Sequence, residues 1–201
     1  MANGTLKVSN IETSSGSGTI TLGQSGETLS VPSGVTLDMS SGTMTLNSDM
    51  KNTPSFLAYR SSSQTISQNT QTKIAFNTEK YDTTAVYDAS TNYRFTPGVA
   101  GKYFIYTQVG SYGGSRPYKI VLSIYKNGSL FVQEARETDL TTNWTSGFAR
   151  QQSVSVVDIA DTDDYYEVFL LERLVSSGDV TIDYNANDPY THFGAYRIIG
   201  A

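Results

Sequence analysis

Residues 76–107, FNTEKYDTTAVYDASTNYRFTPGVAGKYFIYT, decide the fold of this protein. Tyr93 to Phe95 has the aromatic composition of a short β-strand, and Pro97-Gly98 then supplies a turn. A second strand follows from Lys102 to Val109, with large side chains at both odd and even positions. The stretch therefore predicts an antiparallel β protein.

This second strand has two apolar faces. One face carries Tyr103 and Ile105, and the opposite face carries Phe104 and Tyr106. Successive residues of a strand point to opposite sides of the sheet, so both sides of this strand need cover. The domain's own core covers one side, and we expect another copy of the chain to cover the other.

The spacing of the large residues resembles the signature of the complement globular-head family, which is related to tumour necrosis factor. The matching positions are Phe76, Asp82, Tyr87, Phe95, Gly101 and Tyr103. The interval from Tyr87 to Phe95 is one residue longer than the family pattern, and Ile105 and Thr107 stand where the family has aromatic residues. The resemblance implies a jelly-roll sandwich that assembles as a homotrimer.

Composition and charge argue against several classes of protein. The chain has 201 residues, no Cys and a formal net charge of −5, so neither a disulfide-stapled module nor a basic nucleic-acid-binding surface is expected. No apolar run is long enough for a membrane span, so we expect no membrane insertion. Met1 to Val8 lack the basic and apolar regions of a signal peptide. We expect a protein made in the cytoplasm, which leaves the cell by a route such as lysis.

The chain predicts two domains, residues 1–50 and 51–201, because all Tyr, Phe and Trp residues follow residue 50. In the first domain Ser-Gly recurs every eight residues, at Ser17-Gly18, Ser25-Gly26, Ser33-Gly34 and Ser41-Gly42. Alternating apolar residues between these pairs predict turns and short strands. Their number is too small for a core in one chain, so we expect a stalk of intertwined chains. A flexible linker is the alternative.

Residues 51–201 predict about ten strands and no helix. Asn127-Gly128 suits a two-residue type I′ turn, which pairs Tyr125 with Leu130 and Ile124 with Phe131. This hairpin and the ending Phe193 to Ile198 also resemble the complement globular-head family. The expected fold is all-β, a two-sheet jelly-roll head after an N-terminal repeat stalk. An immunoglobulin-like sandwich is the rival, but its Cys-Trp-Cys pattern is absent.

The sequence shows no motif for catalysis. The only His, His192, lies in a predicted strand without a nucleophile motif nearby, so we expect no enzyme and no cofactor. Asp161, Asp163 and Asp164 follow Asp158 in an acidic turn that is a weak calcium candidate. A solvated turn is the favoured interpretation of these residues.

Aromatic residues supply the candidate interaction sites. We expect core positions and trimer contacts at Tyr59, Tyr103, Phe104, Tyr106, Phe169, Phe193 and Tyr196. We expect receptor contacts from loops that carry Tyr112, Arg116, Trp144 and Tyr190. Flat rings beside hydroxyl and amide groups suit sugar or protein surfaces. The alternative is that the loop rings fold back onto the edge of the sandwich.

The N-terminal domain is similar to the short β-repeats of bacteriophage fibre proteins, through Leu6 to Ile11 and Gly18 to Gly23. With a complement-type head, the resemblance implies a trimeric virion protein. Its N-terminal segment would dock on other virion proteins, and its head would contact a host surface protein or glycan. The alternatives are a capsid decoration or head-fibre protein, a secreted complement-like binding protein and, as the enzyme, an appendage depolymerase.

Overall fold

The computed structural model describes residues 50–113, 115–137 and 150–199, together with residues 11, 13, 18–22, 24–38, 40 and 42–46. The chain divides into two compact units, residues 1–45 and 46–201. We call the first the N-terminal unit and the second the head.

The described part of the head contains thirteen strands and no α-helix. In chain order they are β1 (Ser55–Tyr59), β2 (Gln64–Ser67), β3 (Thr72–Lys73), β4 (Thr78–Asp82), β5 (Tyr87–Asp88), β6 (Arg94–Phe95), β7 (Gly101–Tyr112), β8 (Pro117–Lys126), β9 (Ser129–Glu137), β10 (Arg150–Ala160), β11 (Tyr166–Leu174), β12 (Asp179–Ile182) and β13 (His192–Arg197).

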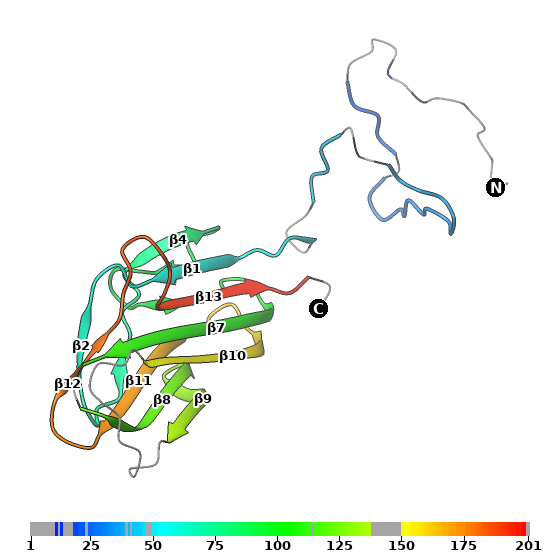
Figure 1. Cartoon of the computed structure of the whole chain (residues 1–201). Helices are drawn as coiled ribbons and strands as arrows, with labels where there is room; N and C mark the ends of the chain where they lie inside the picture. Colours follow the sequence, from blue (N-terminus) through cyan, green and yellow to red (C-terminus); the bar gives the residue numbers. More distant parts are fainter. Residues whose placement is uncertain are drawn as a thin grey trace. The chain divides into compact units, whose positions relative to one another are not determined.

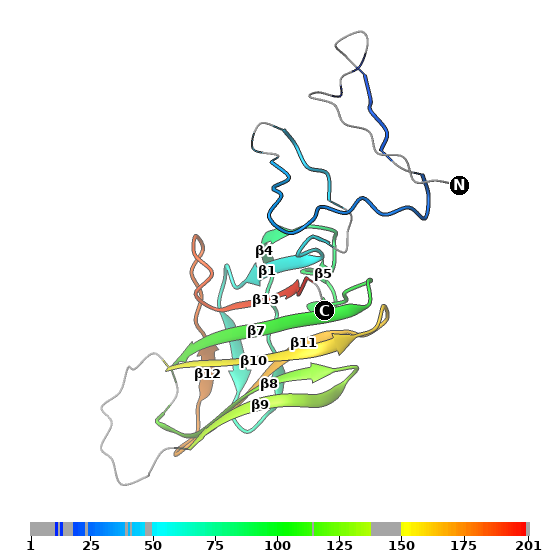
Figure 2. The ribbon, with the colours of Figure 1, turned by 90° about the vertical axis from the view of Figure 1, so that its right-hand side faces the viewer.

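The strands form two antiparallel sheets (Figure 1). Sheet A has the order β2-β12-β7-β13-β1-β4, and β10 pairs with the other edge of β7. Sheet B has the order β5-β6-β11-β8-β9, and β3 pairs with β11. The longest strands, β7, β8 and β10, run across the head in both views (Figures 1 and 2).

The core lies between the sheets and contains a cluster of aromatic rings. The ring of Phe56 lies 4.8 Å from that of Tyr87, 4.9 Å from that of Phe95 and 5.1 Å from that of Phe193. Tyr103 is also fully buried there. Such contacts between rings add to the free energy gained from burying apolar surface. The core therefore joins residues that are far apart in the sequence.

The hairpin of β8 and β9 has the predicted turn but a different register. Asn127 and Gly128 have φ of 53° and 75°, as a type I′ turn requires. Tyr125 pairs with Leu130 as predicted, whereas Ile124 pairs with Val132 rather than with Phe131. A β-bulge at this point takes up Phe131 as an extra residue, which shifts the register by one.

The two ends of the head differ in which strands they contain. At one end β1 begins and β13 ends, because Ser55 pairs with Tyr196. We call this end the base; it lies on the right of the head in Figure 1. At the opposite end, which we call the tip, β7 ends at Tyr112 and β10 begins at Arg150. The chain therefore enters the head and completes its last strand at the base.

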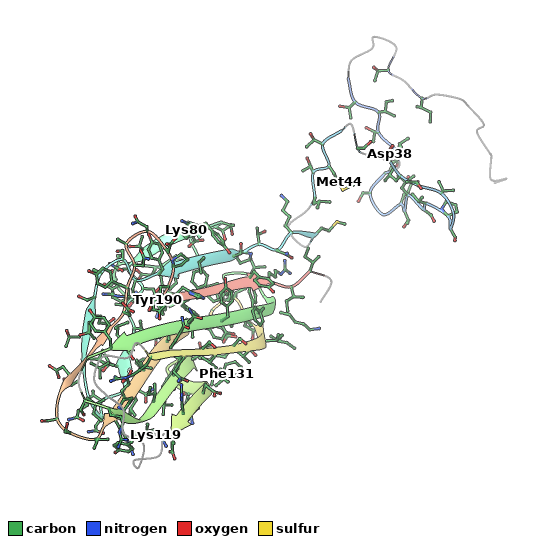
Figure 3. The ribbon with its side chains drawn as sticks, in the orientation of Figure 1. Asp38, Met44, Lys80, Lys119, Phe131 and Tyr190 are labelled. Atoms are coloured by element: carbon green, nitrogen blue, oxygen red, sulfur yellow. The ribbon has the colours of Figure 1, made fainter. Side chains whose placement is uncertain are left out.

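In the N-terminal unit two hydrogen-bonded turns are described, at two of the four Ser-Gly pairs. The Glu27 amide donates to the Gln24 carbonyl (3.0 Å), and the Val35 amide donates to the Pro32 carbonyl (3.1 Å). Gly26 and Gly34 supply the positive φ values of 88° and 83°. The expected short strands do not form among the described residues of this unit. Its apolar side chains are exposed, Met44 among them (Figure 3). The intertwined stalk stays a prediction.

Candidate functional site

The outer face of sheet A carries a continuous row of large side chains. Phe104 and Tyr106 alternate with the core-facing residues of β7, as predicted. The Phe104 ring lies 5.6 Å from that of Tyr106 and 5.5 Å from that of Tyr196 on β13. On β10, Val157 lies opposite Phe104 and is 54% exposed, and Ile159 is 70% exposed. These five residues form what we call the aromatic face.

Gly194 shapes the aromatic face. It pairs with Tyr106, and a Cβ atom at this position would lie 2.5 Å from Cζ of Tyr106. The tyrosine ring can lie flat across β13 only because this glycine has no side chain. Burial also raises the pKa of the Tyr106 phenol above its ordinary value. The ring is therefore an integral part of the face.

The same face becomes polar toward the tip. A pocket of about 290 Å³ lies there, lined in part by Gln108, Ser153, Ser155 and His192. Nδ1 of His192 lies 2.7 Å from the carbonyl oxygen of Pro189, so this nitrogen donates the hydrogen bond. The outer face of sheet A thus combines an apolar half near the base with a polar half near the tip.

The residues predicted as core positions and trimer contacts occupy three places. Phe104, Tyr106 and Tyr196 lie on the aromatic face, whereas Tyr59, Tyr103 and Phe193 are buried. Phe169 lies on the outer face of sheet B, with its ring 4.5 Å from that of Tyr125. The alternation along each strand distinguishes the buried residues from those that point outward. Only the pairing of the strands shows which of the outward residues lie on the same sheet.

Of the predicted receptor-contact residues, Tyr112 ends β7 at the tip, and Arg116 and Tyr190 lie in loops there. Tyr112 is 38% exposed, and Tyr184, which the sequence analysis did not select, is 43% exposed. The ring of Tyr190 packs against Gly110, so this residue follows the alternative prediction that a loop ring folds back. Arg116 ends the β7–β8 loop, and its carbonyl accepts a bond from the Val175 amide. Trp144 lies outside the described residues.

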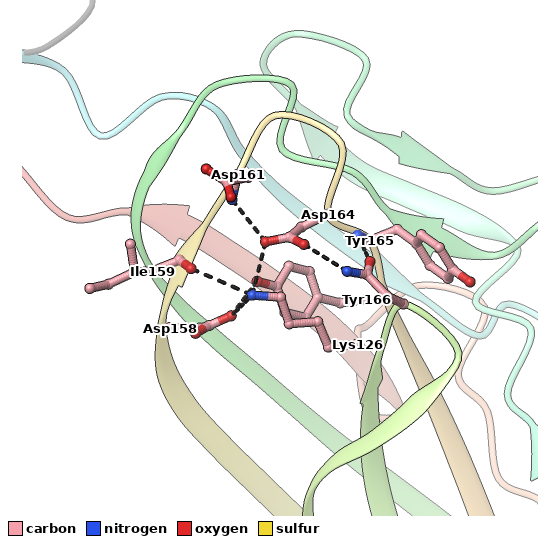
Figure 4. A network of polar contacts seen from close by, with 8 residues as sticks. Lys126, Asp158, Ile159, Asp161, Asp164, Tyr165 and Tyr166 are labelled. Atoms are coloured by element: carbon pink, nitrogen blue, oxygen red, sulfur yellow. Dashed lines mark hydrogen bonds and ion pairs between the residues drawn. The ribbon is translucent and has the colours of Figure 1, made fainter.

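A lysine lies between two carboxylates of the acidic turn (Figure 4). Nζ of Lys126 lies 2.7 Å from Oδ2 of Asp158 and 2.8 Å from Oδ2 of Asp164. The Tyr166 hydroxyl also donates to Asp158, at 2.5 Å. The ammonium group thus takes the place that a cation would take between these carboxylates. In the described part of the chain, no group of three or more His, Cys, Asp or Glu could hold a metal ion.

Two other classes of site concern the single histidine, His192, and membrane-spanning helices. His192 has its hydrogen bond to Pro189 and lies beside Tyr106 on the surface. No helix within the described ranges is long and apolar enough to cross a membrane.

Comparisons with known proteins show the fold of the head. No protein-family model and no curated protein matches the sequence. The structure is similar to that of the Eiger TNF of S. frugiperda, with a TM-score of 0.54 and 11% identity, over 73% of this chain and 93% of that one. The jelly-roll fold of the tumour necrosis factor and complement type, predicted from the sequence, is therefore confirmed for the head.

Two further solved structures are similar at TM-scores below 0.5. The globular domain of the zebrafish complement 1qA protein has a TM-score of 0.48 and 14% identity, over 72% of this chain and 97% of that one. Murine APRIL has a TM-score of 0.49 and 11% identity, over 72% of this chain and 98% of that one.

Proposed function

We propose that this protein is a non-enzymatic homotrimer whose heads associate through the aromatic face and whose tips bind another surface. The observation that carries this proposal is the aromatic face itself. Phe104, Tyr106 and Tyr196 lie together beside Val157 and Ile159, and the two β10 residues are more than half exposed. An exposed apolar patch of this kind marks an interaction site.

A second apolar patch favours a ring over a two-fold dimer. Leu130 and Phe131 on β9 are 51% and 38% exposed, and β9 is an edge strand of sheet B. A two-fold dimer buries one patch against itself, whereas a closed ring joins two different patches of neighbouring copies. The edge at β9 and the aromatic face supply two such patches, which suits a trimer of heads.

The N-terminal unit supports a fibre-like assembly. Leu29 and Leu37 are 67% and 61% exposed in the single chain. The two described turns lie eight residues apart, a spacing that suits a stack of equivalent units. We propose that three copies intertwine here as the stalk of a virion protein, which docks on other virion proteins and presents the head to a host surface protein or glycan. Three copies of each weak tip contact would then act together.

The test is the solution mass measured by light scattering. We expect about three times 21.9 kDa for the full chain, and a trimer also for residues 51–201. V157K places a charge on the aromatic face and is expected to give monomers, because a buried unpaired charge is strongly unfavourable. V175K is the matched control, since Val175 is 51% exposed and lies just after β11 at the tip.

Each outcome bears on a different part of the proposal. A trimer only when residues 1–50 are present would move the assembly to the N-terminal unit. Monomers for both wild-type chains would contradict the trimer. A trimer of V157K with unchanged stability would show that the heads meet elsewhere.

A further inference from the structure

A fully buried carboxylate connects the two sheets near the tip. Glu172 of β11 is 0% exposed and points into the head. Its Oε2 lies 2.7 Å from Nη1 of Arg150 on β10, and its Oε1 accepts a hydrogen bond from the Ser111 hydroxyl on β7. One side chain of sheet B is therefore held by two strands of sheet A.

Arg150 extends this network to the surface. Its Nη2 donates to the carbonyl of Gly113 and to that of Ser115, each at 2.9 Å. The Ser115 hydroxyl in turn donates to the carbonyl of Ser176 (3.1 Å) and accepts a hydrogen bond from the Ser176 amide (3.0 Å). A single guanidinium thus ties the β7–β8 loop, and through it the β11–β12 turn, to the interior of the head.

The surroundings of Glu172 make Arg150 its decisive partner. Among the described residues, Arg150 is the charged side chain that bonds to this carboxylate, and β7 contributes only the Ser111 hydroxyl. On β8 the residue opposite is the apolar Ile120. From the segment after β2, the Asn69 amide donates to the backbone carbonyl of Glu172. A change of charge on Glu172 therefore acts most directly on Arg150.

We propose that the Glu172–Arg150 pair is an interior latch that positions the tip loops, and that uptake of a proton by Glu172 opens the latch in mild acid. A neutral carboxyl no longer holds the guanidinium by charge, so Arg150 and the loop carbonyls that it binds become free to move. The latch lies within one head and does not depend on the oligomeric state.

The charge of Glu172 responds to acid before most carboxylates do. Burial raises the pKa of Glu172 above its ordinary value of 4.5, against the opposing effects of Ser111 and Arg150. The folded head therefore binds this proton at a higher pH than the unfolded chain does. As the pH falls toward 4.5, this group adds to the free energy of unfolding rather than lowering it. The loops can loosen while the sandwich stays folded.

The experiment is amide hydrogen exchange of the full chain, normalised for the intrinsic effect of pH. As the pH is lowered from neutral toward 4.5, the ordinary pKa of a glutamate, we expect exchange in residues 110–117 and 174–178 to become about tenfold faster in the wild type. Residues 120–124 in the core should not change. E172Q should show the fast exchange already at neutral pH and no further response to acid.

E167Q is the matched control. Glu167 also lies on β11 and forms an ion pair, with Lys73 at 2.6 Å, but this pair lies on the outer face of sheet B. It should behave like the wild type. Wild-type protection of the tip in E172Q at neutral pH, or an acid response that persists in E172Q, would overturn the proposal.

The variant Arg150→Lys (R150K) tests the latch if E172Q fails to fold. A lysine keeps a positive charge near Glu172 but lacks the planar fork that binds two carbonyls at once. We expect R150K to retain the fold and to exchange faster at the two tip segments. Equal protection in R150K and wild type would show that Arg150 does not hold the loops.

Discussion

Gly194 shows how one missing side chain shapes a surface. Its place opposite Tyr106 leaves room for the tyrosine ring, which a Cβ atom would meet at 2.5 Å. The colliding atoms belong to the outer end of a rotatable side chain, so the ring can turn away without disturbing the strands. Substitution of Gly194 therefore changes the aromatic face more than the fold.

For G194A we expect a folded head with weaker self-association. The displaced Tyr106 ring removes apolar contact area, which should raise the dissociation constant about tenfold or more. Light scattering over a dilution series measures this effect. In the Y106A background the same substitution should have little further effect, because the ring is already absent. An equal effect of G194A in both backgrounds would contradict this explanation.

Single residues also show what the sequence could predict. The inward and outward faces of β7 follow from alternation, and Tyr103 and Phe104 lie where that pattern places them. The pairing of Glu172 with Arg150 could not be predicted, because it joins strands of different sheets. A Glu that shares the core-facing side of a strand with Val168 and Leu170 is the signal that would prompt a search for such a partner.

At the scale of elements, Lys126 holds two turns together. It ends β8, whereas Asp158 lies on β10 and Asp164 in the turn that follows. Asn127 adds a hydrogen bond from its side-chain amide to Asp164, at 2.7 Å. The β8–β9 and β10–β11 turns therefore support each other at the base.

For K126M we expect a loss of about 2–3 kcal/mol in the free energy of unfolding, because two largely buried carboxylates lose their cation. Urea unfolding measures it. K119M is the control: Lys119 also lies on β8, but its partner Glu137 is 68% exposed, so the loss should be much smaller than for K126M. Equal losses in the two variants would contradict the role given to Lys126. Calcium and chelators should leave the wild-type Tm unchanged, since the Lys126 ammonium already occupies the place between the two carboxylates.

The pH dependence of this network has a defined sign. Hydrogen bonds from Lys126, Asp161 and Asn127 lower the pKa of Asp164 below 3.8, although burial opposes them. A lowered pKa in the folded state means that the stabilisation is present above 3.8 and is lost as the pH falls through the lowered value. Desolvation lowers the pKa of Lys126, but Asp158 and Asp164 outweigh it and raise the pKa above 10.5. The contribution of Lys126 is therefore lost only when the pH rises through this raised pKa. The difference in stability between wild type and K126M should therefore be constant around neutral pH.

The elements themselves were predictable to different degrees. Long strands such as β8 and β11 follow from their alternation and from the Asn127-Gly128 turn. The bulge that moves Phe131 out of register has no local signature, since it depends on how β9 packs at the sheet edge. The strand β3 covers only Thr72–Lys73, although Ile74 and Phe76 after it also alternate and are buried.

At the scale of the whole head, large apolar side chains gather on sheet A near the base and polar ones near the tip, an arrangement that under the proposed function would separate assembly from recognition. The aromatic face is apolar near the base, whereas the exposed rings of Tyr112, at the end of β7, and of Tyr184, in the β12–β13 loop, lie at the tip. We expect the double variant Y112A and Y184A to keep the trimer mass but to lose at least about tenfold in affinity for host cells, because rings dominate such contacts. Flow cytometry with labelled protein measures this.

The control for the double variant is Y165A at the base, where Arg94 lies 4.6 Å from the centre of the Tyr165 ring. This variant should bind cells like the wild type. Full binding by the tip variant, with its mass unchanged, would place the contact surface on another part of the head.

Because β1 begins and β13 ends at the base, both ends of the head's chain lie on one side of it. A biosensor chip could therefore hold the protein by a C-terminal tag and still leave every tip loop in the flowing sample. The same geometry makes the tip loops suitable for inserted epitopes, since foreign sequence placed there would stay clear of the tether.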